Sequence, residues 1–420
     1  MKKSFYLLSA GMTALLLSAC NGGEEAESDG NEDQNGENEE VAEIEFFQAK
    51  PEAVATFDTL IEQFEEENPD IKVEQNSVPD AMTVLTTRFS TGDIPDLFIT
   101  YPVEEDYVTR ANNDYLLDIT DEDFIDDINP EIQDRYLEDG RMYGAALSLN
   151  ANGVLYNKEI FEEYDLDTPE TWDDFVASIE YLDEQGETPI IMGNQSIDQS
   201  SIFNLNFIAQ QFDAEYWEAF NAGEEPVAES PEWQEASEKM LEVIQYAQQD
   251  HMGTDTDQAN ELFANGEGAM YFMGAWVLPT LRDMNDNFDE EFGYFPFPQT
   301  NNPEENVTIS GVDVGLSIAA DTEYPEESLK FVEFLIDEAQ QFADMDGSFS
   351  AVQDVEVQDE VLEGLSPHVE NDQIANWPNH YWAGGTAAEA DFRAHSQDFF
   401  NHQDIEQYLE SLEQMFESYR

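Results

Sequence analysis

The chain of 420 residues contains a single cysteine, Cys20, and this one count constrains how the chain can be stabilised. An intrachain disulfide needs two cysteines, so none can form. A folded domain of this chain must therefore be held together by burial of apolar side chains. The composition permits large cores, because 41% of the residues are hydrophobic and 12% are aromatic.

The residues before Cys20 have the pattern of a secretory signal. Two lysines follow the initial methionine, and the stretch 5–17 is apolar with small residues interleaved. This stretch is too short to span a bilayer, which takes about 20 apolar residues. The sequence therefore predicts that residues 1–20 form the signal peptide of an exported protein.

Leu17-Ser18-Ala19-Cys20 ends this segment and looks like a bacterial lipobox, in which the cysteine is diacylated and becomes the mature N-terminus. Two or three acyl chains hold a protein stably on a membrane, where one chain would not. The alternative is a plain secreted protein with an incidental cysteine. We predict that Cys20 anchors the protein on the extracellular face of the cell membrane, and that this lipid anchor is its only contact with the bilayer.

The segment that follows the cysteine has the composition of a tether. Residues 21–40 include nine acidic residues and no aromatic residue, leucine, isoleucine or valine. Such a segment cannot bury enough apolar surface to offset the entropy of ordering, and its like charges repel one another. We predict a disordered acidic tether over residues 21–42, with the folded part beginning at residue 43.

The charge balance of the whole chain is extreme, with 96 acidic residues against 14 basic ones and a net charge of −82. Nucleic acids and anionic lipid surfaces bind through lysine and arginine, so neither is expected as a partner. A calcium-binding protein would be the functional alternative, but the sequence has no Asp-x-Asp-x-Asp-Gly loop and its acids are spread along the chain. We interpret the acids as a solvated surface adapted to high salt, alkaline pH or both.

A helix pattern between two strand patterns opens the folded part. Apolar residues recur at helical period after Pro51, between the strand-like runs 44–47 and 71–73. The helix is predicted to end at Asn68-Pro69-Asp70. Its apolar face consists of Val54, Phe57, Leu60, Ile61 and Phe64. Strand, helix and strand in this order indicate an α/β sheet.

The same alternation continues toward the C-terminus. Thr171 and Asp174 form a capping-box pattern at the start of a helix that Gly186 ends. A strand and two further helices are predicted at 307–318, 326–342 and 404–419. Roughly 380 residues follow the tether, which suits two or three domains. We find no internal repeat, and we predict an α/β fold with two lobes.

Five sequence blocks, in this order and behind a lipobox, form a specific pattern although each block alone is a weak signal. They include Thr-Gly-Asp-Ile-Pro-Asp-Leu-Phe at 91–98 and Phe-Ala-Asn-Gly-Glu-Gly-Ala-Met-Tyr-Phe-Met-Gly-Ala-Trp at 263–276. The blocks span 64–74, 91–98, 139–175, 263–276 and 311–318. With them the chain resembles the extracellular solute-binding proteins of ABC sugar importers, the family that includes the maltose-binding protein, over nearly all of residues 44–345.

The resemblance implies the two-lobed, periplasmic-binding-protein-like fold of class II, with the ligand held in a cleft between lobes joined by hinge strands. The family's three crossings between lobes would fall near Asn150, Thr308 and Ser350. Each lobe is then discontinuous in sequence. The expected bounds are 43–150 and 309–350 for lobe 1, and 151–308 and 351–420 for lobe 2.

The resemblance also implies the function. The chain would be the lipid-anchored substrate-binding component of an ABC importer, a monomer that captures a neutral sugar or oligosaccharide by hinged closure. Its partners would be that carbohydrate and the transmembrane permease subunits, and it would be no enzyme and need no cofactor. Another polar solute stays open, but a sugar phosphate is disfavoured because phosphate sites use arginine forks or helix N-termini, and the few arginines lie outside the candidate loops.

A sugar site needs aromatic planes for the C–H faces and polar groups for the hydroxyls. In the resembling family, the tryptophan in the place of Trp276 lies in the cleft against a sugar. Asn150 lies six residues before Tyr156, where the maltose-binding protein has a ligand-contacting glutamate. An amide can donate as well as accept, so Asn150 suits hydroxyls. The alternatives are a buried core tryptophan and a mere hinge residue.

Four further candidates lie in loops that the family brings to the cleft or after a hinge strand. Gln48 and Lys50 follow the first strand, Tyr101 follows the strand that contains Asp96, and Asp313 could accept hydrogen bonds from hydroxyls. A surface position is the alternative for each. We interpret Asp96 itself as structural, fixing backbone amides at the end of its strand.

Trp377 and Trp382 complete the candidate set. Together with Tyr381 they form the densest aromatic cluster of the C-terminal lobe, and Trp377-Pro378 and Gly384-Gly385 indicate a loop. Packing in the core is the alternative for both tryptophans.

No catalytic constellation is evident. The five histidines show no metal-binding spacing, and no Gly-x-Ser-x-Gly motif occurs. A surface-anchored glycoside hydrolase nevertheless stays open as an alternative. With 96 acidic residues, some pair of carboxylates will always be close in space, so counting acids cannot decide it.

Overall fold

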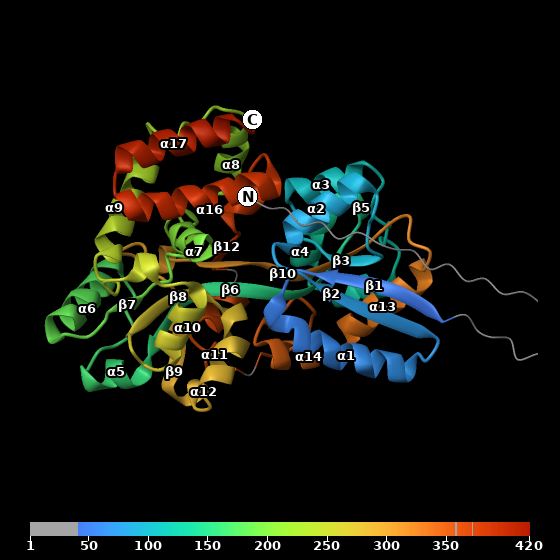
Figure 1. Ribbon diagram of the computed structural model, residues 1–420, viewed down its shortest axis with the longest axis horizontal. Coiled ribbons are helices and arrows are strands. Elements are labelled where there is room, and N and C mark those ends of the chain that lie inside the picture. Colours follow the sequence, from blue (N-terminus) through green and yellow to red (C-terminus); the bar gives the residue numbers. More distant parts are fainter. Residues whose placement is uncertain (1–40, 358, 372) are drawn as a thin grey trace, which may run out of the picture. The chain divides into compact units, whose positions relative to one another are not determined.

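The computed structural model describes residues 41–420 except 358 and 372 (Figure 1). The predicted signal peptide with Cys20 and the tether up to residue 40 lie outside the described residues. Val41–Arg420 forms one compact unit. Among the helices of this part, none is long and apolar enough to cross a membrane.

The first strand, β1 (Ala42–Gln48), lies in parallel between β2 (Ile71–Ser77) and β3 (Leu97–Ile99). The crossover between β1 and β2 is α1 (Val54–Glu67), which buries four of the five residues of the predicted apolar face and leaves Val54 half-buried. The predicted strand–helix–strand unit is therefore confirmed. Ala42, which we assigned to the tether, belongs to β1, because it pairs with Ile71 and is buried.

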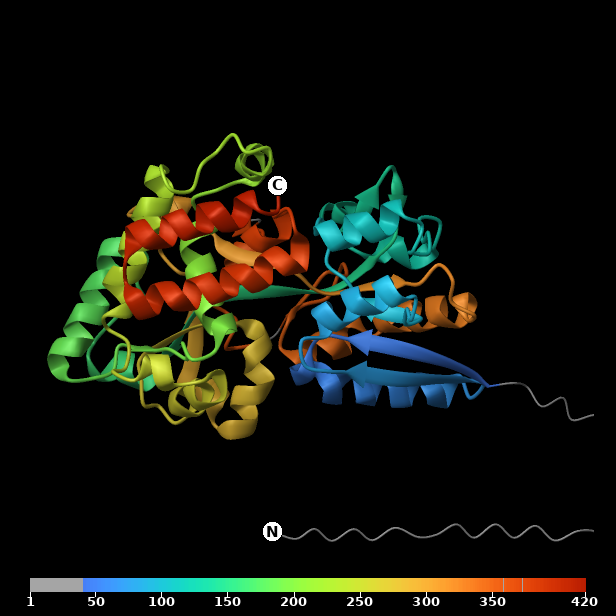
Figure 2. The ribbon, with the colours of Figure 1, turned by 45° about the horizontal axis from the view of Figure 1, so that its top comes forward.

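Two long antiparallel strands run through the middle of the sheet, as Figure 2 shows. They are β6 (Ala145–Asn157) and β10 (Thr308–Ile318), and all of β10 is buried. At one end, β10 also pairs with β3; at the other, β6 pairs with β8 (Met270–Gly274) and β9 (Phe292–Phe295). In the described part, the sheet has ten strands in the order β2-β1-β3-β10-β6-β8-β7, where β7 is Ile190–Ile191. The strands β9 and β11 (Phe349–Ser350) are attached to β6, and β12 (Ile374–Ala375) is attached to β10.

Two clusters of buried apolar side chains lie along these strands. The first core contains Phe46 of β1 and Phe57 of α1, and the second contains Phe272 of β8 and Phe297. Both are rich in edge-to-face aromatic contacts, such as Phe46 on Phe57 at 4.9 Å between ring centroids. Two cores joined by long strands agree with the predicted α/β fold of two lobes.

Helix ends follow the local sequence signals closely in α6 (Trp172–Gln185). The hydroxyl of Thr171 accepts from the backbone N–H of Asp174 and donates to its carboxylate, at 3.2 and 2.6 Å. Gly186 ends the helix with φ at +89°, a conformation that suits glycine. The helix predicted at 326–342 is wrong in extent, because the structure has two helices there, α13 (Pro325–Asp337) and α14 (Ala339–Asp346).

The other helices of the described part surround the sheet. Their bounds are α2 (Ala81–Thr91), α3 (Glu105–Asn112), α4 (Pro130–Gln133), α5 (Lys158–Glu163), α7 (Ile197–Ile208), α8 (Ala214–Asn221), α9 (Pro231–Ile244), α10 (Thr256–Ala264), α11 (Leu278–Met284), α12 (Phe288–Glu291), α15 (Ser366–Glu370), α16 (Gly385–His402) and α17 (Ile405–Glu417). The short strands are β4 (Leu137–Glu138), β5 (Arg141–Met142), β7 (Ile190–Ile191), β11 (Phe349–Ser350) and β12 (Ile374–Ala375).

Candidate ligand-binding site

A buried lysine forms the centre of the candidate site. Lys50 follows β1 and is 4% exposed. Its ammonium binds the carboxylates of Asp313 in β10 and Asp346 at the end of α14, the latter at 3.1 Å. Glu52 lies at 3.9 Å. The Lys50 side chain thus joins the end of β1 to Asp346, which lies 296 positions later in the sequence.

The electrostatics of this cluster follow from burial and charge. Burial by itself would lower the pKa of the Lys50 ammonium, but the charges of Asp313, Asp346 and Glu52 outweigh it and raise this pKa above its usual 10.5. Burial raises the pKa of the Asp346 carboxyl, against the pull of Lys50. Burial also raises the pKa of Glu52 to about 7. One cation therefore serves several carboxyl groups, and the pKa of Glu52 lies near neutral pH.

Asn150 joins this cluster to the second core. Its amide nitrogen donates to Asp313 at 3.3 Å, and its amide oxygen accepts from the backbone N–H of Gly311 at 3.2 Å and from the indole N–H of Trp377 at 2.8 Å. The structure therefore brings together four of the predicted residues, Lys50, Asp313, Asn150 and Trp377, around the β6–β10 ladder.

Two tryptophan rings cover the sheet beside Asn150. Trp276 and Trp377 have ring centroids 5.8 Å apart, and Trp276 packs against both apolar cores. Two glycines, which have no side chain, leave room on the sheet for these rings. A Cβ atom on Gly274 would lie 1.8 Å from the ring of Trp276, and one on Gly311 would lie 2.9 Å from the ring of Trp377.

Asn152 is a candidate that the sequence reasoning missed. It lies two residues after Asn150 in β6, so both amides point to the same face of the sheet. It pairs with Gly274, over which the ring of Trp276 lies. Asn152 is 1% exposed, and neither atom of its amide has a hydrogen-bond partner in the described part. Leaving buried amide groups unpaired is costly, so a ligand or water hydroxyl would find both a donor and an acceptor here. The i, i+2 spacing of the two asparagines was the available signal.

Tyr101 contacts the C-terminal part of the chain through His380, which sequence reasoning also missed. The two rings stack at 5.7 Å between centroids, and the imidazole Nε2 lies 3.6 Å from a carboxylate oxygen of Glu104. Burial lowers the pKa of His380 to about 3, so the ring is neutral at physiological pH. An isolated histidine gives no pattern that sequence reasoning could use.

The other predicted residues have well-defined surroundings. Gln48 is buried, and its amide nitrogen donates to Gln75 at 2.9 Å. Asp96 accepts from the backbone N–H of Glu45 at 2.8 Å, which confirms its structural interpretation. Trp382 lies in the second core, 1% exposed, where it packs on aromatic rings that are not part of the Lys50 cluster. These rings belong to Trp217, Phe392 and Phe416.

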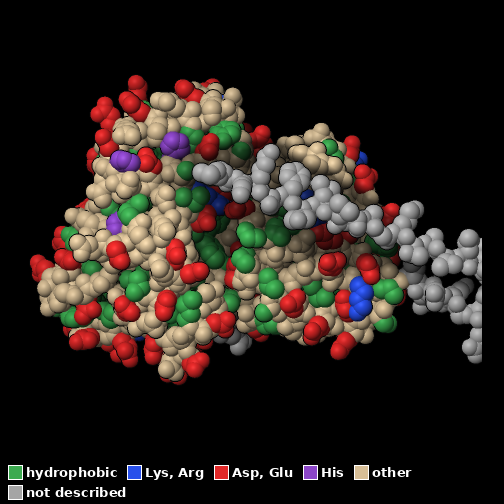
Figure 3. All heavy atoms as spheres, viewed as in Figure 1, with side chains coloured by type: hydrophobic (Ala, Val, Ile, Leu, Met, Phe, Trp, Pro, Cys, Tyr) green, Lys and Arg blue, Asp and Glu red, His purple; other side chains and the backbone are tan. Residues whose placement is uncertain are grey.

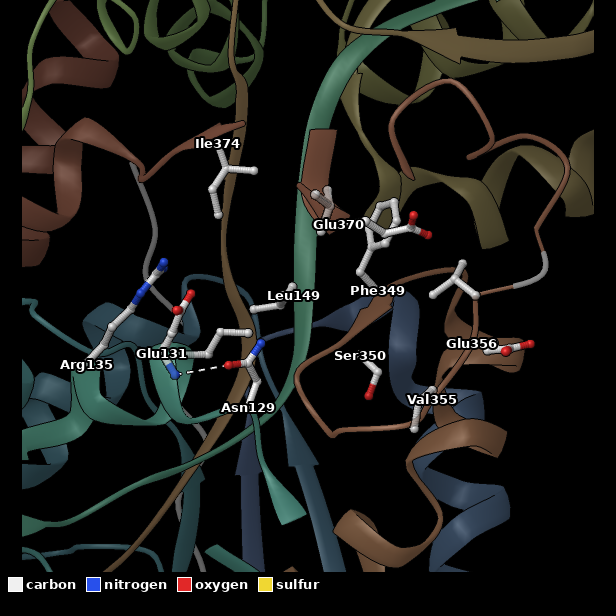
Figure 4. Close-up of a pocket in the computed structure, with 13 residues that line it drawn as sticks. Asn129, Glu131, Arg135, Leu149, Phe349, Ser350, Val355, Glu356, Glu370 and Ile374 are labelled. Atoms are coloured by element: carbon white, nitrogen blue, oxygen red, sulfur yellow. Dashed lines mark hydrogen bonds between the residues drawn. The ribbon is translucent and has the colours of Figure 1, made fainter. Parts of the chain in front are cut away.

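A separate cavity of about 500 Å³ lies on the opposite face of β6 (Figure 4). Its lining includes Leu149, whose side chain points away from that of its neighbour Asn150 because successive residues of a strand alternate. Figure 4 shows Leu149 beside Phe349 of β11, with Arg135 and Glu131 across the cavity. None of the predicted site residues lines this cavity. Among the described residues, no group of histidine, cysteine or acidic side chains could hold a metal ion.

Comparison with known proteins now identifies the family. The model of the family described as bacterial extracellular solute-binding protein matches residues 49–342. The multiple sugar-binding protein of Streptococcus mutans is 31% identical over 392 residues, which cover 91% of this chain and 90% of that protein. The chain belongs to the bacterial extracellular solute-binding proteins, as the sequence blocks predicted.

Solved structures agree with this assignment. The solute-binding protein RafE in complex with raffinose matches with a TM-score of 0.81 at 26% identity, covering 90% of this chain and 99% of RafE. The apo-form of RafE from Streptococcus pneumoniae matches with a TM-score of 0.74 at 26% identity, covering 90% of this chain and 98% of that one. The two-lobed fold is therefore confirmed, and the chain matches the raffinose complex better than the apo-form.

Glu52→Gln is expected to weaken the pH dependence of stability. Because the pKa of Glu52 is raised from 4.5 to about 7, folding favours the protonated carboxyl. Its stabilising contribution is complete below pH 4.5 and is lost as the pH rises through about 7. Between about pH 5 and about pH 8, the parent should lose up to about 3 kcal/mol more unfolding free energy than the variant.

Urea unfolding at both pH values measures this difference. Glu66→Gln, at an exposed position of α1, is the matched control and should behave as the parent. An identical pH dependence in the parent and Glu52→Gln would contradict the interpretation.

Proposed function

We propose that this chain is the sugar-binding component of an ABC importer and captures a neutral sugar or oligosaccharide between its two lobes without chemistry. The observation that carries the proposal is Trp276, a half-buried indole that packs against both cores beside a second indole and two amides. The named functions of its relatives, a multiple sugar-binding protein and a raffinose-binding one, favour the same ligand class.

The chemistry of the candidate residues suits hydroxyl groups. The indoles of Trp276 and Trp377 offer flat apolar faces for sugar C–H groups, and the amide of Asn152 offers a donor and an acceptor. Asp313 and Lys50 can accept and donate at the edge of the rings. The candidate set contains no arginine, which disfavours a phosphorylated ligand.

Closure would proceed about the two long strands. Because β6 and β10 enter both cores, a change of their twist would rotate one core against the other around Asn150. A ligand held by residues of both cores favours the closed form, and that form offers the permease subunits a liganded shape to recognise. We propose that the protein acts in this way as a monomer and without a cofactor.

A glycoside hydrolase is disfavoured by the state of the carboxylates. Asp313 and Asp346 both bind the Lys50 ammonium, so the two carboxylates of the site are engaged in ion pairs rather than placed on either side of a ligand. The relatives named above are binding proteins. Release of shorter sugars on incubation with oligosaccharides would reverse this conclusion.

Trp276→Ala should weaken binding of the best ligand from a panel of neutral sugars at least tenfold. The reason is the loss of ring stacking and of apolar contact area, together at least about 1.4 kcal/mol. Isothermal calorimetry measures the affinity, and small-angle scattering with and without sugar measures compaction. Trp172→Ala, which removes a half-buried indole of α6 that packs on Phe175, Phe207 and Phe297, is the matched control. Unchanged affinity for Trp276→Ala would remove this residue from the site, and an unchanged radius of gyration on saturation would remove closure.

We also propose that Cys20 carries the lipid anchor and that the protein resides on the extracellular face of the membrane. Cys20→Ser should abolish membrane retention and leave the folded part unaffected, since the Cys20 position precedes β1. Membrane fractionation measures retention, and metabolic labelling with palmitate measures acylation. The sugar affinity of the soluble variant is the control that the folded part is unaffected. Equal palmitate incorporation in parent and variant would contradict the anchor.

We attribute the acidic surface to adaptation to a saline or alkaline medium. Figure 3 shows acidic side chains spread over the visible face with few lysines and arginines among them. Unscreened repulsion opposes the folded state, so the melting temperature should rise as NaCl increases to about 0.5 M, where the Debye length is already short. Calorimetry measures it, and sucrose at equal osmolality is the control because it does not screen charge. A melting temperature that stays flat or falls with NaCl would exclude the attribution.

A further inference from the structure

We propose that Glu105 and Asp106, the first residues of α3, are positioning residues that hold the segment 377–386 over the candidate site. Ligand affinity would then depend on two carboxylates that touch no ligand. This inference rests on the proposed function, because the segment matters only if the site between the cores binds a ligand.

Direct hydrogen bonds join the two carboxylates to this segment. Asp106 accepts from the backbone N–H of Thr386 at 3.2 Å and from its hydroxyl at 2.6 Å. Glu105 accepts from the backbone N–H of Gly384. Tyr107, the next residue of α3, belongs to the first core. Thr386 is the second residue of α16, which buries Ala388 in the second core, so these bonds span both cores.

The local geometry of the segment depends on this contact. Gly384 and Gly385 have φ angles of +92° and +49°, which favour glycine. A Cβ atom on Gly385 would lie 2.9 Å from the Asp106 carboxylate, so a side chain there would interfere with the close approach.

The contact also completes the start of α16. The helix begins after Gly384 and has no capping side chain of its own at that position. The first N–H groups of a helix need acceptors, and a negative charge is favoured there by the helix dipole. Glu105 and Asp106 supply both from the other core, so separating the cores would leave the helix end uncapped.

The same ten-residue stretch carries side chains of the candidate site. Trp377 donates to Asn150, and His380 stacks on Tyr101 beside Glu104. Contacts with Asn150, Tyr101 and Glu104 therefore fix the first residues of the stretch against β6 and the first core. Glu105 and Asp106 of α3 hold its last residues, 384–386. Asn221 of α8 also binds this stretch, through the carbonyl of Tyr381 at 2.6 Å and the N–H of Ala383 at 3.2 Å, so the carboxylates of α3 add a further attachment to the first core.

The closer match to the raffinose complex of RafE than to its apo-form agrees with this reading, since contacts between the cores belong to a ligand-bound arrangement. Asp106 also lies 3.9 Å from the guanidinium of Arg110, one turn later in α3.

The test compares Asp106→Ala with Asp121→Ala, an exposed acid of the same core with the same change in charge. With raffinose as the probe, stopped-flow kinetics should show dissociation from Asp106→Ala accelerated roughly fivefold to tenfold, as for a lost helix cap. The association rate should be unchanged, because encounter precedes the contact. Asp106→Asn, which keeps an acceptor but not the charge, should restore part of the effect, and Asp121→Ala should behave as the parent.

A second measurement needs no sugar. Dye pairs at Asn113→Cys in the loop after α3 and Asn401→Cys in α16, in the Cys20→Ser chain, report the distance between the cores. Asp106→Ala should shift the unliganded distance distribution toward longer separation. Identical distributions and dissociation rates in parent and variant would overturn the inference. A shifted distribution with no raffinose binding in the parent would support the positioning role and contradict the sugar assignment instead.

Discussion

The pairing of β6 with β10 determines where Asn150 and Asp313, the polar centre of the candidate site, lie. Its register sets Asn150 opposite Gly311, where the small glycine leaves room for the Trp377 ring. Between Val312 and Val314 the register is irregular, and Asp313 lies outside the one-to-one pairing. That irregularity frees its carboxylate to reach Lys50 from one side and Asn150 from the other. A strand pair that enters both cores therefore carries the polar centre between them.

That centre contains its own counter-charges before any ligand arrives. The chain has a net charge of −82, yet it buries an ammonium in contact with two carboxylates. Removing Lys50 would leave Asp313 and Asp346 buried without a counter-charge, which is strongly destabilising. Because the cluster already contains its own counter-ions, a ligand need not carry charge to be accommodated there. The counter-ions of the cluster and the flat indole faces both favour a neutral solute such as a sugar.

Local features of the fold were predictable, because they depend on neighbours in sequence. The apolar face of α1 and the Thr171 cap of α6 are of this kind. The break between α13 and α14 was missed because no glycine or proline marks it. In the site, family resemblance pointed to Lys50 and Asp313, but their ion pair joins residues 263 positions apart and no pattern within one segment encodes it.

The aromatic cluster near the C-terminus also shows that a local sequence pattern does not reveal contacts with distant residues. Trp377 and Trp382 are five residues apart, yet Trp377 bonds to Asn150 while Trp382 packs in the second core. The 3-10 helix Pro378–Tyr381 between them changes the direction of the chain. Composition alone could not tell which of the two faces the site.

The glycines under the two indoles have a consequence for how such a site can evolve. The Trp276 ring fills the place of a Cβ atom at Gly274, and the Trp377 ring crowds that place at Gly311. A change at either aromatic position would open space on the sheet for a differently shaped solute, whereas any change at either glycine would expel the ring above it. While the indoles remain, selection should keep both glycines, so that these positions are constrained as pairs, Gly274 with Trp276 and Gly311 with Trp377.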